Sequence, residues 1–167
     1  MRVALADIPF EPDREFRRFE EANANAGAIA SFVGRCRPYS QGASVASLEL
    51  QHYPGFTERE ISRFVEQILT SSGLHDVLVI HRVGAIMPGE AIVFVAAASD
   101  HRAAALQAVE ALIDFLKTDA PLWKREIRSD GEHWVEPTSR DYERRQAHGT
   151  QAQSTPAQNT PVKNARS

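Results

Sequence analysis

The chain has 167 residues, of which 43% are hydrophobic and 25% are charged, so it can form one domain with a sizeable core. Its formal net charge of -3 argues against a general nucleic-acid-binding protein, and its longest apolar run, residues 91–98, is too short to cross a membrane. The one cysteine, Cys36, excludes an internal disulfide, and residues 1–10 lack the apolar stretch of a signal peptide, so we expect a cytoplasmic protein that binds neither nucleic acid nor membrane.

Apolar patterns and turn residues predict strands and two helices in the first half of the chain. The strands are expected at residues 2–8, 28–33 and 45–53. The first helix is expected to begin at Pro12, because proline is suited to the first position of a helix. The second helix has the clearest amphipathic pattern, over residues 61–69, and is expected to begin at a capping box of Thr57 and Glu60.

The second half of the chain predicts four strands around a central helix. The strands are expected at residues 77–81, 91–98, 122–128 and 132–135, of which the last two form a hairpin. The helix is expected to begin after Asp100 as its N-cap and to end before Pro121. This order of elements predicts an α+β fold with a mainly antiparallel sheet and three main helices.

The composition changes at about Pro137. The remaining residues are rich in Arg, Gln, Asn, Thr and Pro and contain almost no large apolar side chain. We therefore predict a single domain over residues 1–137, followed at residues 138–167 by a disordered tail with a short helix at most.

Basic side chains gather at the ends of the predicted elements, where binding residues are commonly found. They are Arg35, Arg37, His101, Arg102, Lys117, Lys124 and Arg125. One such residue alone is typical of a solvated surface charge. A cluster of them in a protein of net negative charge indicates a pocket for a small, phosphate-bearing anion.

Other residues admit simpler interpretations. His81 is interpreted as a buried core histidine, and Trp123 and Trp134 as packing residues of the core or of the hairpin. The histidines lack the spacing of metal ligands, so no metal site is predicted. A nucleophilic role for Cys36 stays open, although alternation along an extended segment would point it away from the arginines on either side.

Five short motifs then occur in order between about Gly27 and Val135. They are Phe32-Val33-Gly34 with Arg37, His52-Tyr53-Pro54-Gly55, His81-Arg82-Val83-Gly84, Ser99 with His101-Arg102, and Leu116-Lys117 followed by Pro121, Trp123-Lys124 and Glu126. This ordered set resembles the large, catalytic subunit of molybdopterin synthase. Phe56 departs from the family pattern, which usually has Met, and Cys36 departs from a common apolar residue.

The resemblance implies an α/β-hammerhead fold and a homodimer in which each protomer binds a small ubiquitin-like sulfur-carrier subunit, giving a heterotetramer. It implies a sulfurtransferase that needs no cofactor. Sulfur would arrive as a thiocarboxylate on the carrier's C-terminal Gly-Gly and pass to cyclic pyranopterin monophosphate, forming the dithiolene of molybdopterin. A hydrolase with Cys36 as nucleophile, and a non-catalytic module that binds a ubiquitin-like tail, stay as alternatives.

The resemblance also implies roles for individual residues. Lys117 matches the family's essential lysine and would act as an acid, a base or an acyl acceptor, and Lys124 would orient substrate and stabilise negative charge. The expected substrate-binding residues are Arg35, Arg37, His101, Arg102, Arg125 and Glu126. His101 and Lys117 are 16 residues apart on one helix, or about 24 Å at a rise of about 1.5 Å per residue. We therefore predict that each pocket is shared between two protomers.

Overall fold

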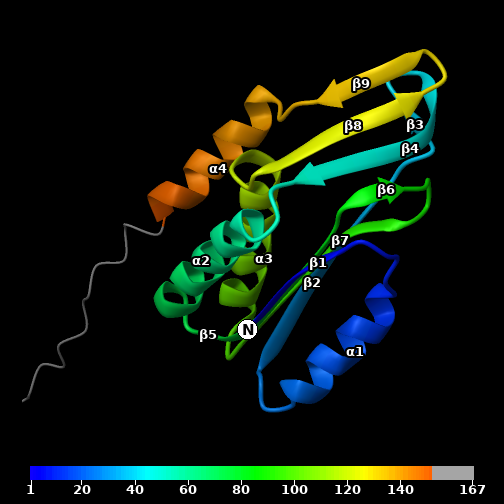
Figure 1. Ribbon diagram of the computed structural model, residues 1–167. Coiled ribbons are helices and arrows are strands. Elements are labelled where there is room, and N and C mark those ends of the chain that lie inside the picture. Colours follow the sequence, from blue (N-terminus) through cyan, green and yellow to red (C-terminus); the bar gives the residue numbers. More distant parts are fainter. Residues whose placement is uncertain (152–167) are drawn as a thin grey trace, which may run out of the picture.

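A four-stranded sheet forms the centre of the computed structural model, which describes residues 1–151 (Figure 1). Its strands lie in the order β1 (Arg2–Ala6), β5 (Leu74–Arg82), β7 (Ala91–Ser99) and β2 (Ala28–Arg35). β1 runs parallel to β5, and the other two pairs are antiparallel. Because β7 lies inside the sheet and is covered on both faces, its residues 91–98 are all apolar rather than alternating.

A second sheet carries the predicted hairpin. Its strands lie in the order β3 (Tyr39–Ser40), β4 (Ala43–His52), β8 (Leu122–Arg128) and β9 (Gly131–Val135), and β6 (Gly84–Ile86) also pairs with β4. All of these pairs are antiparallel. The predicted α+β fold with mainly antiparallel sheets is therefore confirmed, and the short strands β3 and β6 are additions to it.

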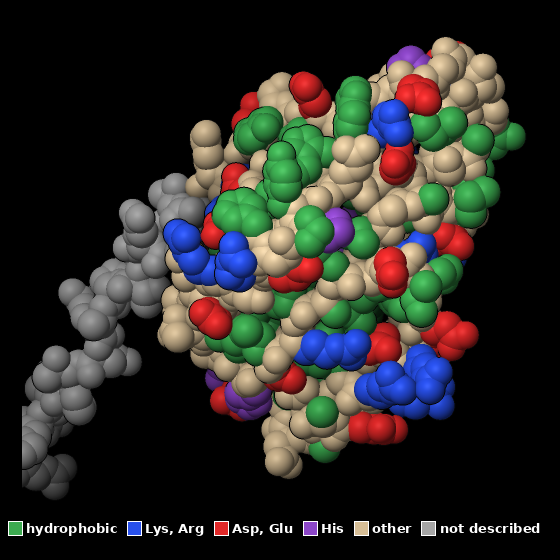
Figure 2. Space-filling view, viewed as in Figure 1, with side chains coloured by type: hydrophobic (Ala, Val, Ile, Leu, Met, Phe, Trp, Pro, Cys, Tyr) green, Lys and Arg blue, Asp and Glu red, His purple; other side chains and the backbone are tan. Residues whose placement is uncertain are grey.

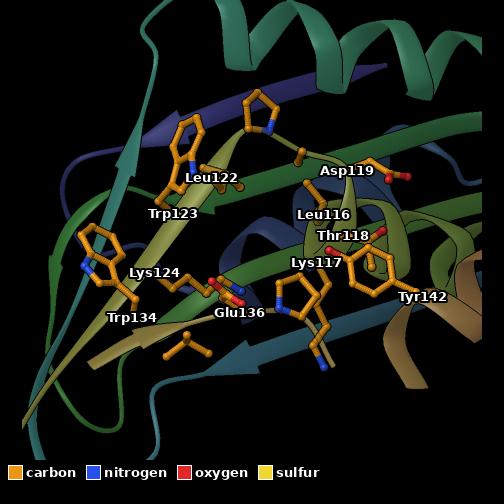
Figure 3. A pocket seen from close by; sticks show the side chains of 14 residues that line it. Leu116, Lys117, Thr118, Asp119, Leu122, Trp123, Lys124, Trp134, Glu136 and Tyr142 are labelled. Carbon is orange, nitrogen blue, oxygen red and sulfur yellow. The ribbon is translucent and has the colours of Figure 1, made fainter. Parts of the chain in front are cut away.

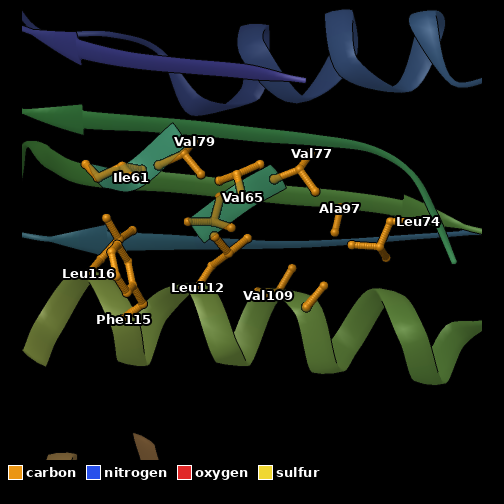
Figure 4. Packing of buried hydrophobic residues seen from close by; sticks show 12 residues of the cluster. Ile61, Val65, Leu74, Val77, Val79, Ala97, Val109, Leu112, Phe115 and Leu116 are labelled. Atoms are coloured by element: carbon orange, nitrogen blue, oxygen red, sulfur yellow. The ribbon is translucent and has the colours of Figure 1, made fainter. Parts of the chain in front are cut away.

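Helices cover both faces of the first sheet (Figure 1). The face opposite α1 (Pro12–Ala22) is covered by α2 (Phe56–Ser71) and α3 (Arg102–Thr118). Val77 and Val79 of β5 pack with α2 and α3 (Figure 4), whereas Leu78 and Ile80 pack with α1. Each fully buried side chain of this kind stabilises the fold by ~1.5–3 kcal/mol. Within the described residues, no helix is long and apolar enough to span a membrane.

The start of α2 differs from the prediction. Its N-cap is Gly55, whose backbone N–H donates a hydrogen bond of 2.7 Å to the carboxylate of Glu58. Gly55 has a φ of 76°, a conformation that glycine adopts readily and other residues rarely do. The predicted capping box of Thr57 and Glu60 is therefore wrong, because the helix begins one residue before Thr57.

Thr57 instead connects α2 to the segment between α3 and β8. Its side chain is fully buried, and its hydroxyl donates to the carbonyl of Pro121 at 3.1 Å. The same hydroxyl accepts the backbone N–H of Tyr53 at 3.1 Å. The conformation of the α3–β8 connection is thus held by a side chain from another element.

The N-cap of α3 is His101, one residue after the predicted Asp100. The backbone N–H of His101 donates to the hydroxyl of Ser99 at 3.3 Å. The carboxylate of Asp100 lies 3.0 Å from Nε2 of His75 and makes no cap. The predicted central helix is otherwise confirmed.

α4 (Ser139–Gln151) occupies the start of the segment that was predicted to be a disordered tail with a short helix at most. It lies against α3, so the folded part of the chain extends past the predicted boundary at residue 137 (Figure 1). Charged contacts connect the two helices, from Asp141 to Lys117 and from Arg145 to Asp119. The rest of the predicted tail, residues 152–167, lies outside the described residues.

Candidate active site

Lys117 and Lys124 come from two consecutive elements. Lys117 lies in the last turn of α3, and Lys124 lies in β8, beyond the proline that follows the helix. Both lysines line two cavities, of about 700 Å³ and about 440 Å³. Among the described residues, the two linings share only these lysines and Leu116. The lysine pair therefore connects two separate openings.

The larger cavity, here called the aromatic cavity, lies between the α3–β8 connection, β9 and α4. Figure 3 shows Trp123 and Trp134 on one side of it and Tyr142 on the other. The tryptophans are 43% and 56% exposed, so neither lies in the core. Trp134 packs against Arg125 across the hairpin, as predicted, and Trp123 packs edge-on against Tyr53. Exposed hydrophobic side chains also occur between the charged ones on the face shown in Figure 2.

The smaller cavity, here called the cationic cavity, brings together four predicted site residues. They are Arg35, Arg37, Lys117 and Lys124. Arg35 ends β2 and Arg37 follows it, and both are exposed, whereas Cys36 between them is buried. Guanidinium groups match the geometry of phosphate oxygens, so this cavity is suited to a phosphate-bearing anion.

The two lysines have different electrostatic surroundings. Burial lowers the pKa of Lys124, the ammonium of Lys117 lowers it further, and the carboxylate of Asp141 acts in the opposite direction. Lys117 donates a hydrogen bond of 2.6 Å to Asp141. Lys124 therefore loses its proton more readily than an ordinary lysine, and Lys117 has a carboxylate partner.

Asp141 was missed by the sequence analysis. Its side chain is 7% exposed and accepts hydrogen bonds from the backbone N–H and the hydroxyl of Thr138, at 2.8 and 2.7 Å. Burial raises the pKa of this carboxyl, but the hydrogen bonds from Lys117 and Thr138 outweigh burial and bring the pKa to about 2. The pattern Thr-x-x-Asp, which resembles a capping box, was the available signal in the sequence.

His81 is buried, as predicted, but it also lines the cationic cavity. Its side chain is 1% exposed, and its Nδ1 lies 2.8 Å from the carbonyl of Arg82. Burial, together with the charge of Lys124, lowers the pKa of His81 from its ordinary value near 6.5 to about 4. The imidazole is therefore neutral at pH 7.

This neutral histidine predicts a pH dependence of stability. Between about pH 6.5 and pH 4 the unfolded chain binds a proton at His81 that the folded protein does not, so the free energy of unfolding falls as the pH falls. The lowered pKa of His81 corresponds to a loss of about 3 kcal/mol in the free energy of unfolding over this pH range. Urea denaturation at several pH values measures it, with His81→Gln as the comparison. If the free energy of unfolding depends on pH equally in the wild type and in His81→Gln, the lowered pKa of His81 is contradicted.

His101 and Arg102 do not line either cavity. They lie exposed at the N-terminal end of α3, and Lys117 lies in the last turn of the same helix. One chain therefore does not bring these predicted binding residues to the lysine pair.

Arg125 and Glu126 also lie outside the two cavities. Arg125 is ion-paired with Glu49 and Glu132, and the carboxylate of Glu126 lies 3.7 Å from Arg128. Side chains alternate along β8, so Arg125 points away from the face that carries Lys124. The structure thus pairs Arg125 with carboxylates of neighbouring strands instead of placing it in the pocket.

Cys36 has the surroundings of a structural cysteine. It is 5% exposed and packs with Val45, Leu48, Leu50 and Ile86. Burial raises the pKa of its thiol, and the carboxylates of Glu126 and Glu90 raise it further. Since the thiolate is the nucleophilic form, these surroundings oppose a catalytic role for Cys36.

Known proteins share both the sequence and the fold. The family model described as MoaE protein matches residues 5–119. The molybdopterin synthase catalytic subunits of Caulobacter vibrioides and Yersinia pestis are 48% and 46% identical, in each case over 84% of this chain and 93% of the relative. The molybdopterin cofactor biosynthesis protein E from Burkholderia multivorans matches the structure with a TM-score of 0.72 at 34% identity, over 89% of this chain and 97% of that chain. The chain therefore belongs to the MoaE protein family, the family of the molybdopterin synthase catalytic subunits, and is an enzyme subunit of cofactor biosynthesis.

Proposed function

We propose that the protein transfers sulfur from a small ubiquitin-like carrier subunit to cyclic pyranopterin monophosphate, forming the dithiolene of molybdopterin. The observation that carries this proposal is the pair of cavities joined at Lys117 and Lys124. Such a site can receive a sulfur donor through one opening and an anionic acceptor through the other, with their reacting atoms meeting at two cations. Similarity to molybdopterin synthase catalytic subunits supports the same reaction.

The aromatic cavity is the proposed site for the carrier's C-terminus. A Gly-Gly end that carries a thiocarboxylate is narrow, so it can lie extended between flat aromatic side chains. Trp123 and Trp134 offer apolar surface together with indole N–H donors. Lys117 and Lys124 would attract the negatively charged thiocarboxylate to the junction of the two cavities.

The cationic cavity is the proposed site for the acceptor. Arg35 and Arg37 would bind the oxygens of its cyclic phosphate. His101 and Arg102 would reach the same substrate from a second protomer, since they lie at the other end of their own α3. The proposed assembly is therefore a homodimer with one carrier bound to each protomer.

In the proposed reaction, the thiocarboxylate sulfur attacks an electrophilic carbon of the pyranopterin. The carbon–oxygen bond at that carbon breaks, its oxygen leaves with the electron pair and takes up a proton, and a thioester forms between the substrate and the carrier. Water then cleaves the bond between sulfur and the acyl carbon, which leaves sulfur on the substrate and a carboxylate on the carrier. Lys124 would stabilise the negative charge on the acyl oxygen during this cleavage. Lys117 would transfer protons, and two loaded carriers supply the two sulfurs.

The test is incubation of the protein with the pyranopterin substrate and a thiocarboxylated carrier, followed by mass spectrometry of the products. Formation of dithiolene together with carrier carboxylate is the expected result. Release of phosphate without sulfur transfer would instead support a hydrolase, and binding of the carrier without any product would support a non-catalytic module.

Cys36→Ala is expected to retain sulfur transfer within about twofold, because the sulfur comes from the carrier and the thiol is buried. Removing the buried sulfur is expected to cost about 1 kcal/mol of stability. Dithiolene formation and the melting temperature are the measurements. Loss of turnover in a folded Cys36→Ala protein would revive the hydrolase alternative.

A further inference from the structure

We propose that Asp141 is a positioning residue that holds the ammonium group of Lys117 at the junction of the two cavities. This inference rests on the proposed function, in which Lys117 transfers protons. It makes the first turns of α4 a part of the active site.

The contact joins a mobile type of side chain to a fixed one. The side chain of Lys117 is 48% exposed, and such a lysine has ~2 kcal/mol of rotamer entropy to lose when it is held in one place. Asp141 is almost fully buried, and its Oδ2 accepts both hydrogen bonds from Thr138. Its Oδ1 is thereby aimed at Nζ of Lys117, 2.6 Å away. The carboxylate provides a fixed end point for a flexible chain.

A second anchor fixes α4 itself. Arg145 lies one turn after Asp141 on the same face of the helix, and its Nε donates to the carboxylate of Asp119 at 2.5 Å. Its guanidinium also lies 4.9 Å from the ring centre of Phe64 and 5.9 Å from that of Phe115. The two rings stack at 4.2 Å. Asp141 is therefore presented by a helix that is held at two points.

Stabilisation of α4 alone does not account for this contact. Oδ2 of Asp141 already accepts the hydrogen bonds from Thr138 at the start of α4. An ion pair with a half-exposed lysine contributes only ~0–1 kcal/mol to the stability of the fold. Oδ1 of Asp141 is directed to the C-terminal end of α3, where Lys117 lines both cavities. Tyr142, the next residue of α4, lines the aromatic cavity. Asp141 thus connects the site of the carrier's C-terminus to the position of Lys117.

The kinetic test compares Asp141→Asn with Asp141→Glu and Arg145→Gln. Asp141→Asn removes the charge, and it is expected to lower kcat for dithiolene formation about tenfold or more, with KM for the pyranopterin changed less than twofold. Asp141→Glu restores a carboxylate and is expected to recover part of kcat. Arg145→Gln weakens the docking of α4 but leaves the Lys117 contact in place. If Arg145→Gln lowers kcat as much as Asp141→Asn at a matched loss of melting temperature, Asp141 acts only through the stability of α4 and the proposal fails.

A second measurement does not depend on the reaction. The chain has three lysines, Lys117, Lys124 and Lys163, so lysine labelled with carbon-13 at Cε gives a simple NMR spectrum. The signal of Lys117 is identified by its absence in Lys117→Arg. In Asp141→Asn it is expected to move toward the position of lysine in an unfolded chain. An unchanged Lys117 signal would refute the contact and with it the proposal. If the Lys117 signal moves in Asp141→Asn but the wild-type protein forms no dithiolene, the proposed reaction is refuted and the positioning of Lys117 by Asp141 is supported.

Discussion

Lys117→Arg is expected to lower the rate of dithiolene formation by about a thousandfold, although it keeps the positive charge. Arginine is effectively never neutral, so it cannot serve as a proton acceptor or as an amine nucleophile. General acid–base catalysis typically contributes ~10²–10⁴-fold, which sets the expected size of the loss. Arginine can still pair with Asp141, so the contact to α4 is kept and the loss reports on proton transfer.

Lys124→Arg is the matched comparison and is expected to lower the rate only about tenfold, because its proposed role is positive charge. Single-turnover rates of the two variants, each with saturating loaded carrier, are the measurement. Burial and Lys117 lower the pKa of Lys124, so this comparison also tests the opposite assignment. A larger loss in Lys124→Arg than in Lys117→Arg would make Lys124 the group that transfers the proton.

Mixed dimers of Arg102→Ala and Lys117→Ala are expected to recover about a quarter of all active sites. Each variant alone should be nearly inactive. After the two are unfolded together and refolded, random pairing makes about half of the dimers mixed, and each mixed dimer has one intact site and one doubly damaged site. Activity per dimer after refolding, compared with wild type treated in the same way, is the measurement.

The structure explains why this result is expected. α3 is one continuous helix over residues 102–118, with Arg102 at its first position and Lys117 in its last turn. Neither His101 nor Arg102 lines the aromatic cavity or the cationic cavity, both of which Lys117 lines. If mixed dimers form and no activity returns, the site lies within one chain, and His101 and Arg102 must be given up as binding residues.

The sequence predicted the elements that have a regular apolar pattern. The central helix, the hairpin of β8 and β9 and the strands of the first sheet all follow from periodicity and turn residues. α4 could not be found in this way, because Asp141 and Arg145 connect it to α2 and α3 through charged and cation–π contacts. A pattern search for apolar stripes is insensitive to such a helix.

Four residues of the candidate site were also predictable, because they lie where predicted elements end. Arg35, Arg37, Lys117 and Lys124 lie at or near the ends of elements, and the fold brings them to one cavity. Arg125 follows Lys124 directly in a strand, so alternation already placed it on the other face. The exposure of Trp123 and Trp134 was not predictable, because large apolar side chains also occur on protein surfaces.

The distance between the two lysines depends on a helix that contains neither of them. The short connection from α3 to β8 would be free to change its shape if only its own residues held it. The buried hydroxyl of Thr57, at the start of α2, donates a hydrogen bond to the carbonyl of Pro121, the last residue of this connection. A change in the first turn of α2 would therefore alter the spacing of Lys117 and Lys124 without touching either residue, so α2 helps to set the geometry of the proposed active site.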